Sequence, residues 1–242
     1  MNIFGKTEVG KVRKDNQDRY LFGTLNDGAI YSIVCDGMGG VSGGSVASDI
    51  AIKSIVEEIN TKFNNNMTNN EIKNLCFSAM NIANSIIYEI SSKEKALTGM
   101  GTTVVLVILV ENTAHIFHIG DSRAYLIKNN EVKQMTKDHS FVQEMVDLGK
   151  LSKQDAKTHP KKNIITRALG VSKNIEAEYT NIELEDTDVL MLCTDGLINH
   201  INEDEFIDLL VENELQITCD KLVKLALDRG GKDNITLVLL SK

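Results

Sequence analysis

The sequence contains no tryptophan, a single proline and few aromatic residues, which make up 5% of its 242 residues. Aliphatic side chains must therefore fill the core, and no indole ring is available as a platform for stacking bases or sugars. Neither Pro160 nor any Ser/Gly/Pro-rich linker indicates a domain boundary, and no internal repeat is visible. We expect one domain that covers residues 1–242.

Basic stretches are also missing. The chain has 26 Lys and Arg against 34 Asp and Glu, a formal net charge of −8, and no Lys/Arg run is longer than two residues. A nucleic-acid-binding protein needs a basic face to neutralise phosphates, so we expect no nucleic acid partner and no binding to an anionic membrane surface. The longest apolar run, Val104 to Val110, is far shorter than the roughly 20 residues of a membrane span. The N-terminal residues lack the apolar region of a signal peptide, and we expect a cytoplasmic protein.

The four cysteines have no paired spacing, which argues against a disulfide framework and against a cysteine-based zinc site. None is followed six residues later by the arginine that a cysteine phosphatase loop requires. We expect reduced and mostly buried thiols at Cys35, Cys76, Cys193 and Cys219.

Strand patterns occur in consecutive groups and helix patterns occur in pairs. This order favours antiparallel sheets covered by helix pairs over a regular alternation of strand and helix. The polar stretch 136–163 carries two helix-start signals, at Ser140 and Ser152. The fold class is therefore α+β, an antiparallel β-sandwich flanked by helix pairs in the order α-β-β-α. The expected strands are 2–9, 18–25, 29–36, 101–110, 113–120, 123–128, 189–194 and 234–240, and the expected helices lie at 47–59, 75–90, from a cap at Asn202, and 220–229.

Aspartates stand at the ends of several predicted core strands, namely Asp36, Asp121, Asp195 and Asp233. Each alone could be an ordinary turn residue, since Asp-Gly pairs are common in turns. Four carboxylates at the mouths of buried strands are costly unless cations or hydrogen bonds compensate them, which favours one shared site.

A bound metal compensates this charge better than the few nearby cations, for which Arg13, Arg123 and Arg167 are the candidates. Carboxylate and carbonyl ligands without clustered His or Cys indicate a hard ion, Mg²⁺ or Mn²⁺ rather than Zn²⁺. The sequence has no EF-hand loop spacing, which disfavours Ca²⁺.

Eight short motifs occur in the order Arg13 to Asp18, Asp36-Gly37-Met38-Gly39-Gly40, Gly99 to Thr103, Gly120-Asp121-Ser122-Arg123, Thr136 to Ser140, Thr166 to Gly170, Thr194-Asp195-Gly196-Leu197 and Gly231-Lys232-Asp233-Asn234. In this order they resemble the motif series of the metal-dependent PPM (PP2C-type) Ser/Thr protein phosphatases of bacteria. The resemblance runs from about Arg13 to Leu240, nearly the whole chain.

The resemblance implies a site that holds two Mg²⁺ or Mn²⁺ ions. The Asp36 carboxylate would bridge both ions, with Asp195 and Asp233 on the first and the Gly37 carbonyl on the second. Asp18 would act from the outer shell by holding metal-bound water.

Two further roles follow from the same resemblance. Asp121, together with Asp195, would bind a third and weaker metal. Arg13 would bind the phosphoryl oxygens with its guanidinium fork, which makes Arg13, Asp36, Asp195 and Asp233 the expected catalytic residues. A flap subdomain at about 137–170 would lie beside the active site and would contribute to substrate selection.

One position departs from many eukaryotic members, which have a histidine where this chain has Met38. Methionine cannot donate a proton to the leaving alkoxide, so the acid must be metal-bound water, His139 or another group. For His139 itself, a functional role and a structural hydrogen-bonding role both remain open.

The sequence therefore predicts an enzyme, a phosphoprotein phosphatase that hydrolyses phosphoserine and phosphothreonine by attack of a water activated by two metals. Phosphorylated proteins, including a Ser/Thr kinase that it opposes, are the expected partners, and we expect a monomer. Two alternatives remain: a metal-binding pseudophosphatase that acts as a regulatory binding module, and an active enzyme whose substrates are phosphorylated anti-sigma antagonists or small phosphomonoesters.

Overall fold

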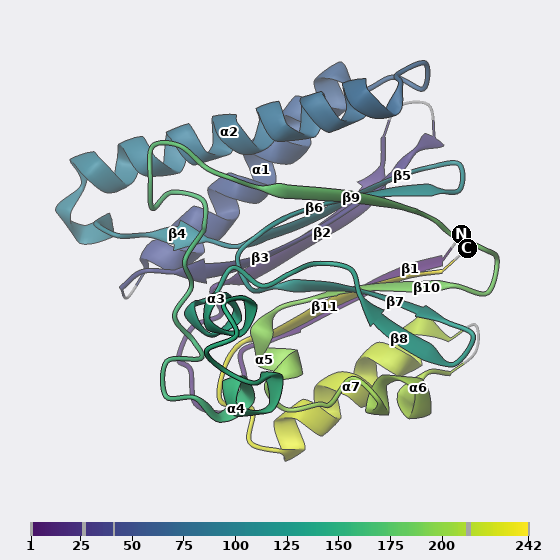
Figure 1. Ribbon diagram of the computed structural model, residues 1–242. Helices are drawn as coiled ribbons and strands as arrows, with labels where there is room; N and C mark the ends of the chain where they lie inside the picture. Colours follow the sequence, from purple (N-terminus) through teal and green to yellow (C-terminus); the bar gives the residue numbers. More distant parts are fainter. Residues whose placement is uncertain (1, 26–27, 41, 212–213, 242) are drawn as a thin grey trace.

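Two antiparallel β-sheets packed face to face form the centre of the computed structural model, which describes residues 2–25, 28–40, 42–211 and 214–241 (Figure 1). The first sheet has the strand order β1-β11-β10-β7-β8 and the second β2-β3-β5-β6-β9, with β4 paired to β3. The strands are β1 (Asn2–Glu8), β2 (Asp18–Thr24), β3 (Ile30–Met38), β4 (Gly101–Thr102), β5 (Val104–Val110), β6 (Thr113–Ile119), β7 (Arg123–Lys128), β8 (Glu131–Gln134), β9 (Glu178–Glu183), β10 (Val189–Cys193) and β11 (Ile235–Ser241).

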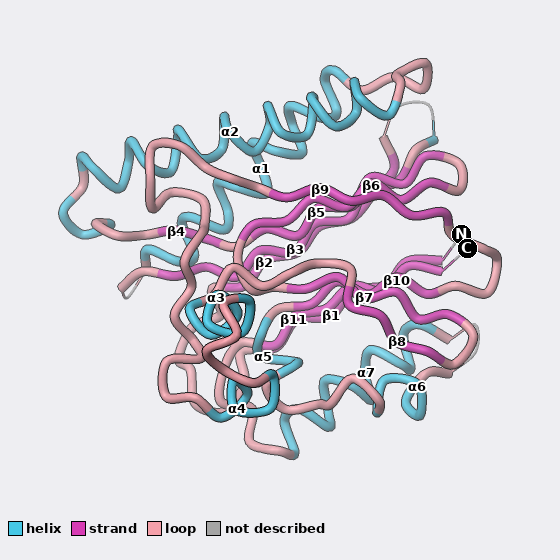
Figure 2. The backbone as a smooth tube through the Cα atoms, in the orientation of Figure 1, coloured by secondary structure: helices cyan, strands magenta, loops and turns pink. Residues whose placement is uncertain are grey.

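Helices cover both outer faces of the sandwich (Figures 1 and 2). The pair α1 and α2 lies over the second sheet, where α1 contacts β2 and β3, and α7 lies over β1 and β11 of the first sheet with α6 beside it. Three short helices, α3, α4 and α5, lie at the end of the sandwich away from the chain termini (Figure 1). The helices are α1 (Gly43–Lys62), α2 (Asn69–Lys93), α3 (Phe141–Asp147), α4 (Lys153–Thr158), α5 (Asp195–Ile198), α6 (Glu205–Leu209) and α7 (Leu215–Asp228), with a 3₁₀ turn, η2, at Lys95–Leu97.

Buried side chains form three layers that follow from this arrangement. One cluster fills the space between α1, α2 and the second sheet, one lies between α6, α7 and the first sheet, and one lies between the two sheets. Strands β5 and β11 are buried along almost their whole length, as their continuous aliphatic sequences predict. The predicted α-β-β-α sandwich is confirmed.

Local sequence signals explain where several helices begin. Thr68 and Glu71 form a reciprocal capping box at the start of α2, because the Thr68 hydroxyl accepts from the Glu71 N–H and the Glu71 carboxylate accepts from the Thr68 N–H. Ser140 and Ser152 cap α3 and α4 in the same position, so both helix starts that the sequence predicts in this polar stretch are confirmed.

Other boundaries differ from the sequence prediction. The Glu205 carboxylate accepts from the Asn202 N–H at 3.0 Å, but Asn202 is not the cap residue, because α6 begins at Glu205. Helix α7 begins at Leu215, five residues before the expected start at Asp220. Strand β8 was not expected; it follows a two-residue turn in which Asn129 and Asn130 both adopt positive φ, at 52° and 60°.

The four cysteines are buried and unpaired with one another, as expected. Within the described part of the chain, no helix combines the length and the apolar character needed to cross a membrane.

Candidate active site

Both sheets bring aspartates to the same end of the sandwich. Asp18 begins β2 and Asp36 lies near the end of β3 in the second sheet, whereas Asp195 follows β10 and Asp233 precedes β11 in the first. Since β10 and β11 are antiparallel neighbours, the end of one lies beside the start of the other, which places Asp195 close to Asp233.

Six of the seven residues that the sequence predicts for the site line one cavity of about 450 Å³, and the seventh, Asp18, is buried next to it. The cavity is open to solvent, and Arg13 and the exposed Gly40 lie in its wall. The six lining residues are Arg13, Asp36, Gly37, Asp121, Asp195 and Asp233.

Asp18 and Asp36 lie directly opposite each other in the register of β2 and β3. Side chains at paired positions share one face of a sheet, so two like charges are held side by side, which destabilises the ionised pair. Burial and the neighbouring carboxylates raise the pKa of Asp18 to about 7, and burial followed by the charge of Asp18 raises that of Asp36 well above its ordinary value. The Asp18 Oδ2 accepts from the Thr194 hydroxyl at 2.9 Å, whereas its Oδ1 has no partner among the described residues.

The pKa values of Asp195 and Asp121 are raised as well. Burial first, and then the charge of Asp233, raises the pKa of Asp195 to about 6. Burial and the charge of Asp195 raise the pKa of Asp121 well above its ordinary value, and the Asp121 Oδ1 also lacks a partner in the described ranges. The cavity therefore gathers more negative charge than its own protein groups compensate.

Among the described arginines considered as compensating cations, Arg13 is the one that forms an ion pair with this cluster. Its Nη2 lies 2.7 Å from the Asp233 Oδ2, and the Arg13 side chain is 55% exposed. Arg123 instead binds Asp138, and Arg167 lies near Glu178 at 3.6 Å. Arg13 thus keeps donors free toward the open cavity.

The backbone around Gly37 leaves no room for a side chain. A Cβ at this position would lie 2.1 Å from the carbonyl oxygen of Gly44, and the Gly37 N–H donates to the Gln17 carbonyl at 3.2 Å. This close approach brings the backbone of β3 against the start of α1 and makes the buried Gly37 part of the cavity wall.

Asn234 fixes the segment that carries Arg13. Its amide group donates to the carbonyls of Val9 and Asp15 at 2.9 and 3.0 Å, and its Oδ1 accepts from the Gln17 N–H at 2.8 Å. One side chain at the start of β11 thus holds both ends of the loop before β2. The position of Arg13 relative to Asp233 depends on this loop.

The donor set fits a hard divalent cation. The cavity offers carboxylate oxygens and the backbone of Gly37, and two of the neighbouring buried oxygens have no partner among the described residues, which is the ligand chemistry of Mg²⁺ and Mn²⁺. No cysteine or histidine lines this cavity among the described residues. The aspartates are spread around an open volume, which suits ions that keep several water ligands.

A tighter group of possible metal ligands lies outside this cavity: His118, His139 and Glu178, whose donor atoms lie within 4.8 Å of one another. His139 Nδ1 accepts from the Gly120 N–H at 3.1 Å, so the neutral ring carries its proton on Nε2, which faces Glu178 at 3.2 Å. A nitrogen that carries a proton cannot ligate a metal, so these hydrogen bonds disfavour a metal there.

These contacts also decide between the two roles considered for His139. The ring is buried, stacks on His118 at 4.6 Å and supports the backbone of Gly120, next to Asp121. It does not line the cavity that contains Asp36. His139 therefore has a structural position, and the hypothesis that it is the general acid is not supported.

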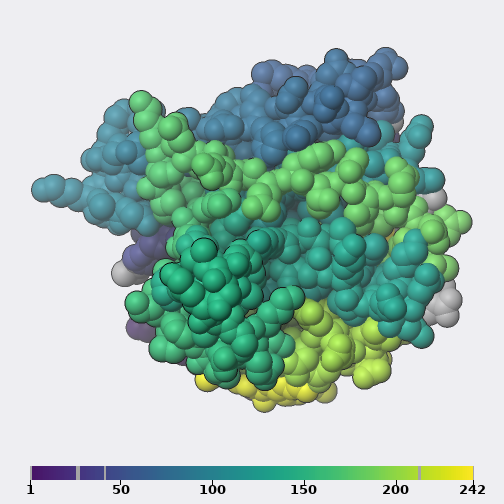
Figure 3. All heavy atoms as spheres, in the orientation of Figure 1, coloured from purple at the N-terminus to yellow at the C-terminus, as the bar shows by residue number. Residues whose placement is uncertain are grey.

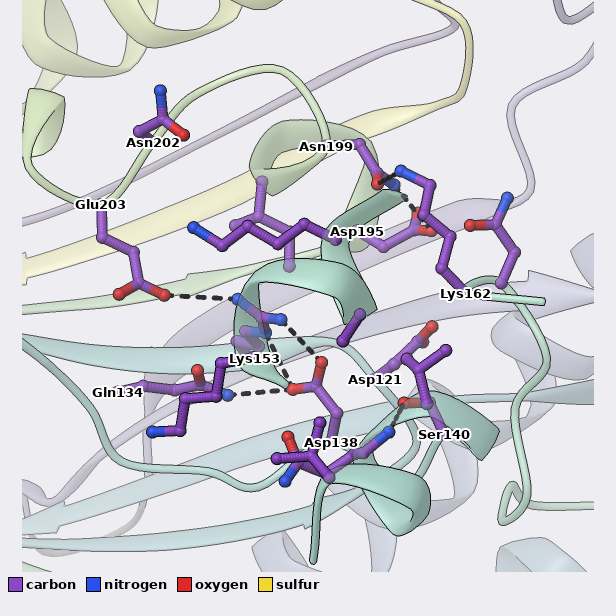
Figure 4. Close-up of a pocket in the computed structure, with 18 of the residues that line it drawn as sticks. Asp121, Gln134, Asp138, Ser140, Lys153, Lys162, Asp195, Asn199, Asn202 and Glu203 are labelled. Atoms are coloured by element: carbon purple, nitrogen blue, oxygen red, sulfur yellow. Dashed lines mark hydrogen bonds and ion pairs between the residues drawn. The ribbon is translucent and has the colours of Figure 1, made fainter. Parts of the chain in front are cut away.

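The sequence analysis missed contacts that join the flap to Asp195. Asn199 Nδ2 donates to Asp195 Oδ2 at 3.1 Å, and Lys162 Nζ donates to Asn199 Oδ1 at 2.8 Å (Figure 4). The spacing of four residues between Asp195, which begins α5, and Asn199, which caps its C-terminal end, was an available signal, since residues four apart in a helical turn share one face. The contact between Lys162 and Asn199 had no such signal in the sequence, because it joins segments far apart in the chain.

Comparison with known proteins gives a match to the family Protein phosphatase 2C over residues 11–224. The chain is 37% identical to the serine/threonine phosphatase stp of Listeria welshimeri, over 98% of this chain and 94% of that protein. It is also 37% identical to the protein phosphatase PhpP of Streptococcus pneumoniae, over 100% of this chain and 97% of that protein.

Solved structures show the same similarity. The serine/threonine phosphatase of S. agalactiae superposes with a TM-score of 0.92 at 32% identity, and 98% of each chain is covered. The serine/threonine phosphatase Stp1 of Staphylococcus aureus gives a TM-score of 0.93 at 30% identity, with 99% of this chain and 94% of that chain covered.

Proposed function

Because the chain belongs to the protein phosphatase 2C family, we propose that it hydrolyses phosphoserine and phosphothreonine in bacterial proteins with the help of divalent metal ions at the aspartate cavity. The observation that carries this proposal is that Asp36, Asp121, Asp195 and Asp233 and the exposed Arg13 line one open cavity between the two sheets, with Asp18 buried beside it. The chain is a protein phosphatase by family, and its substrates are phosphoproteins.

The residues of the cavity would divide the work between metal binding and phosphate binding. Two Mg²⁺ or Mn²⁺ ions would be held by Asp36, Asp195, Asp233 and the Gly37 carbonyl. Asp18 would hold water that is bound to these ions. Such ions supply an activated water and take up charge on the phosphoryl oxygens. Asp121, with Asp195, would hold a third, weaker ion.

Arg13 is suited to orient the phosphoryl group. Its guanidinium reaches the cavity from the loop before β2, one side of it is held by Asp233, and its remaining donors face solvent. A planar fork of donors binds two phosphoryl oxygens at once and compensates the charge that moves onto them during transfer.

The leaving group must obtain its proton without an imidazole. Met38 lines the cavity at the position where many eukaryotic members of the family have a histidine, and His139 lies outside the cavity. We expect the proton to come from water or from one of the carboxylic acids of the cavity rather than from a histidine.

The proposal extends to the setting of the reaction. The enzyme would act in the cytoplasm as a monomer of one domain, residues 1–242 with the flap at about 137–170, and would oppose a Ser/Thr kinase of the same bacterium. The names of the relatives support the substrate class. The choice between Mg²⁺ and Mn²⁺ in the cell depends on availability as well as on affinity, which favours Mn²⁺.

Turnover of p-nitrophenyl phosphate and of a phosphothreonine peptide, with Mn²⁺ and with a chelator, tests the proposal. We expect metal-dependent turnover of both, and a loss of at least roughly 100-fold in Asp36→Asn, because removal of a metal ligand costs more than removal of the residues that orient ligands. Asp220→Asn, an exposed carboxylate on α7, is the matched control and should retain turnover. Wild-type protein without metal-dependent turnover would contradict the proposal.

The same assay addresses the alternatives. A pseudophosphatase should have lost part of the ligand set, whereas every predicted ligand lies in or beside the cavity. A preference for small phosphomonoesters over every phosphopeptide would instead retain the chemistry and change the substrate.

A further inference from the structure

A second cavity, of about 510 Å³, adjoins the aspartate cavity (Figure 4). The two share Asp121, Asn163 and Asp195 in their walls. The flap, with α3 and α4, forms one side of the second cavity, and residues of β7, β8 and the segment around α5 form the other. Figure 3 shows the flap, coloured teal-green, as a raised mass on this face of the molecule. A peptide whose phosphoryl group lies at Arg13 could therefore place a neighbouring side chain under the flap.

Asp138 and Glu203, the acidic side chains of this second cavity that lie outside the metal site, are already compensated within the wall. Asp138 accepts two hydrogen bonds from the Arg123 guanidinium, at 2.8 and 2.7 Å, and a third from Gln134 at 2.9 Å. Glu203 accepts from Arg123 at 3.4 Å and from the Tyr125 hydroxyl at 3.0 Å. Asp121 and Asp195 belong to the metal site.

Two cations of the wall are not compensated. Lys153 and Lys157 both line the cavity from α4, and neither ammonium group has an ion-pair or hydrogen-bond partner among the described residues. They are four residues apart, so their side chains lie on one side of the helix, a single turn from each other. Lys162, the other lysine of this wall, is occupied by Asn199.

Part of the same wall is aliphatic. Val142 and Val146 of α3, Ala156 of α4, and Ile198 and Ile201 near α5 contribute to it. A concave wall that is partly apolar reduces solvent screening, so an anion held in the cavity beside Lys153 and Lys157 would be bound more strongly than on a flat surface.

We propose that the second cavity is a subsite for an anionic side chain of the phosphoprotein substrate, a carboxylate or a second phosphoryl group, bound by Lys153 and Lys157. The proposal rests on the phosphatase function proposed above and adds a substrate preference to it. The two cavities share part of their walls, so an extended peptide, which advances about 3.3 Å per residue, could place an anionic side chain in the second cavity within a few residues of the phosphorylated residue.

The test compares phosphothreonine peptides that differ at one position, scanned over the four residues on each side. Glutamate or phosphoserine at that position is compared with glutamine. We expect the wild-type enzyme to favour an anionic residue at one or two positions by about 3- to 10-fold in kcat/KM, the range of two partly screened ion pairs. The preference should shrink when salt rises from about 0.05 M to about 0.5 M.

Variants assign the preference to the two lysines. In the double variant Lys153→Met with Lys157→Met, the ratio of kcat/KM between the glutamate and glutamine peptides should fall to about one. In Lys153→Glu with Lys157→Glu, the enzyme should favour a lysine peptide instead, a gain that a misfolded flap cannot produce. Lys150→Met is the matched control, because Lys150 is an exposed flap lysine outside the cavity wall, and it should keep the wild-type ratio.

Two results would overturn the subsite: equal rates for anionic and glutamine peptides in the wild-type enzyme, or a preference that persists in both double variants. Either result leaves turnover of the glutamine peptide intact and so leaves the proposed function standing. If phosphoserine is favoured and glutamate is not, the subsite selects multiply phosphorylated substrates.

Discussion

Replacement of Asp18 by asparagine should stabilise the metal-free protein, although Asp18 is buried and hydrogen-bonded. The side chain is 1% exposed and lies opposite Asp36 in the strand register. Burial and like charges raise its pKa from 3.8 to about 7, a difference that corresponds to about 4 kcal/mol of unfavourable free energy for the ionised form above neutral pH. Asparagine removes this charge and can still accept the hydrogen bond from Thr194.

We expect Asp18→Asn to raise the free energy of unfolding by about 2 to 3 kcal/mol at pH 8 with a chelator present, less than the full figure because Asp36 shares the repulsion. Urea unfolding measures this value. The sign of the pH dependence is fixed. A carboxyl whose folded-state pKa is raised binds more protons in the folded than in the unfolded state, so wild-type stability falls as pH rises from about 4 to about 7. The advantage of Asp18→Asn should therefore vanish near pH 4.

Addition of Mn²⁺ should stabilise the wild-type protein more than it stabilises Asp18→Asn. A ligand that binds the folded state at about 100 times its dissociation constant stabilises it by about 2.7 kcal/mol, and wild type should show a gain of this kind. Asp18→Asn should gain less, because the cavity has lost a charge that attracts the ion. Destabilisation of the metal-free protein by Asp18→Asn, or an undiminished response to Mn²⁺, would refute the reasoning.

Two further substitutions separate phosphate binding from metal binding. Arg13→Lys keeps the positive charge beside Asp233 but loses the planar fork, so kcat/KM for a phosphopeptide should fall about 10-fold or more while the thermal shift caused by Mn²⁺ stays near the wild-type value. Asn199→Ala removes the hydrogen bond that orients Asp195, so the affinity for Mn²⁺, measured by calorimetry, should fall about 10-fold, whereas Asn81→Ala on α2 should leave it unchanged. Unchanged phosphopeptide kinetics in Arg13→Lys, or unchanged Mn²⁺ affinity in Asn199→Ala, would contradict these assignments.

The architecture and the chemistry-bearing residues could be predicted from the sequence because both rest on local signals. Continuous aliphatic runs identified β5 and β11. A serine followed three residues later by glutamine or aspartate identified the starts of α3 and α4. The aspartates could be found because each follows or precedes such a run. That six of the seven predicted site residues line one cavity, with the seventh beside it, is a result of the sheet pairing.

Contacts between distant segments could not be predicted in this way. Strand β9 is half exposed and only pairs with β6 at the sheet edge, so its sequence carries little apolar pattern. The position of His139 depends on the backbone of Gly120, and the partner of Lys162 lies 37 residues away. The second cavity exists only where the flap meets the segment around α5, and no single segment carries its signature.

The net charge of −8 acquires a structural meaning from the aspartate cavity. Five of the carboxylates gather at one end of the sandwich, where a single arginine of the described chain pairs with one of them. Two bound divalent ions would reduce the net charge to −4, so part of the acidic excess belongs to an internal cation site rather than to the surface. Asp36, Asp121, Asp195 and Asp233 lie in or next to strands whose central residues are buried, and this apolar packing is what can hold like charges together before ions bind. Binding of metal ions would therefore be coupled to folding, because the core holds the carboxylates at positions that cations in the cavity would make favourable.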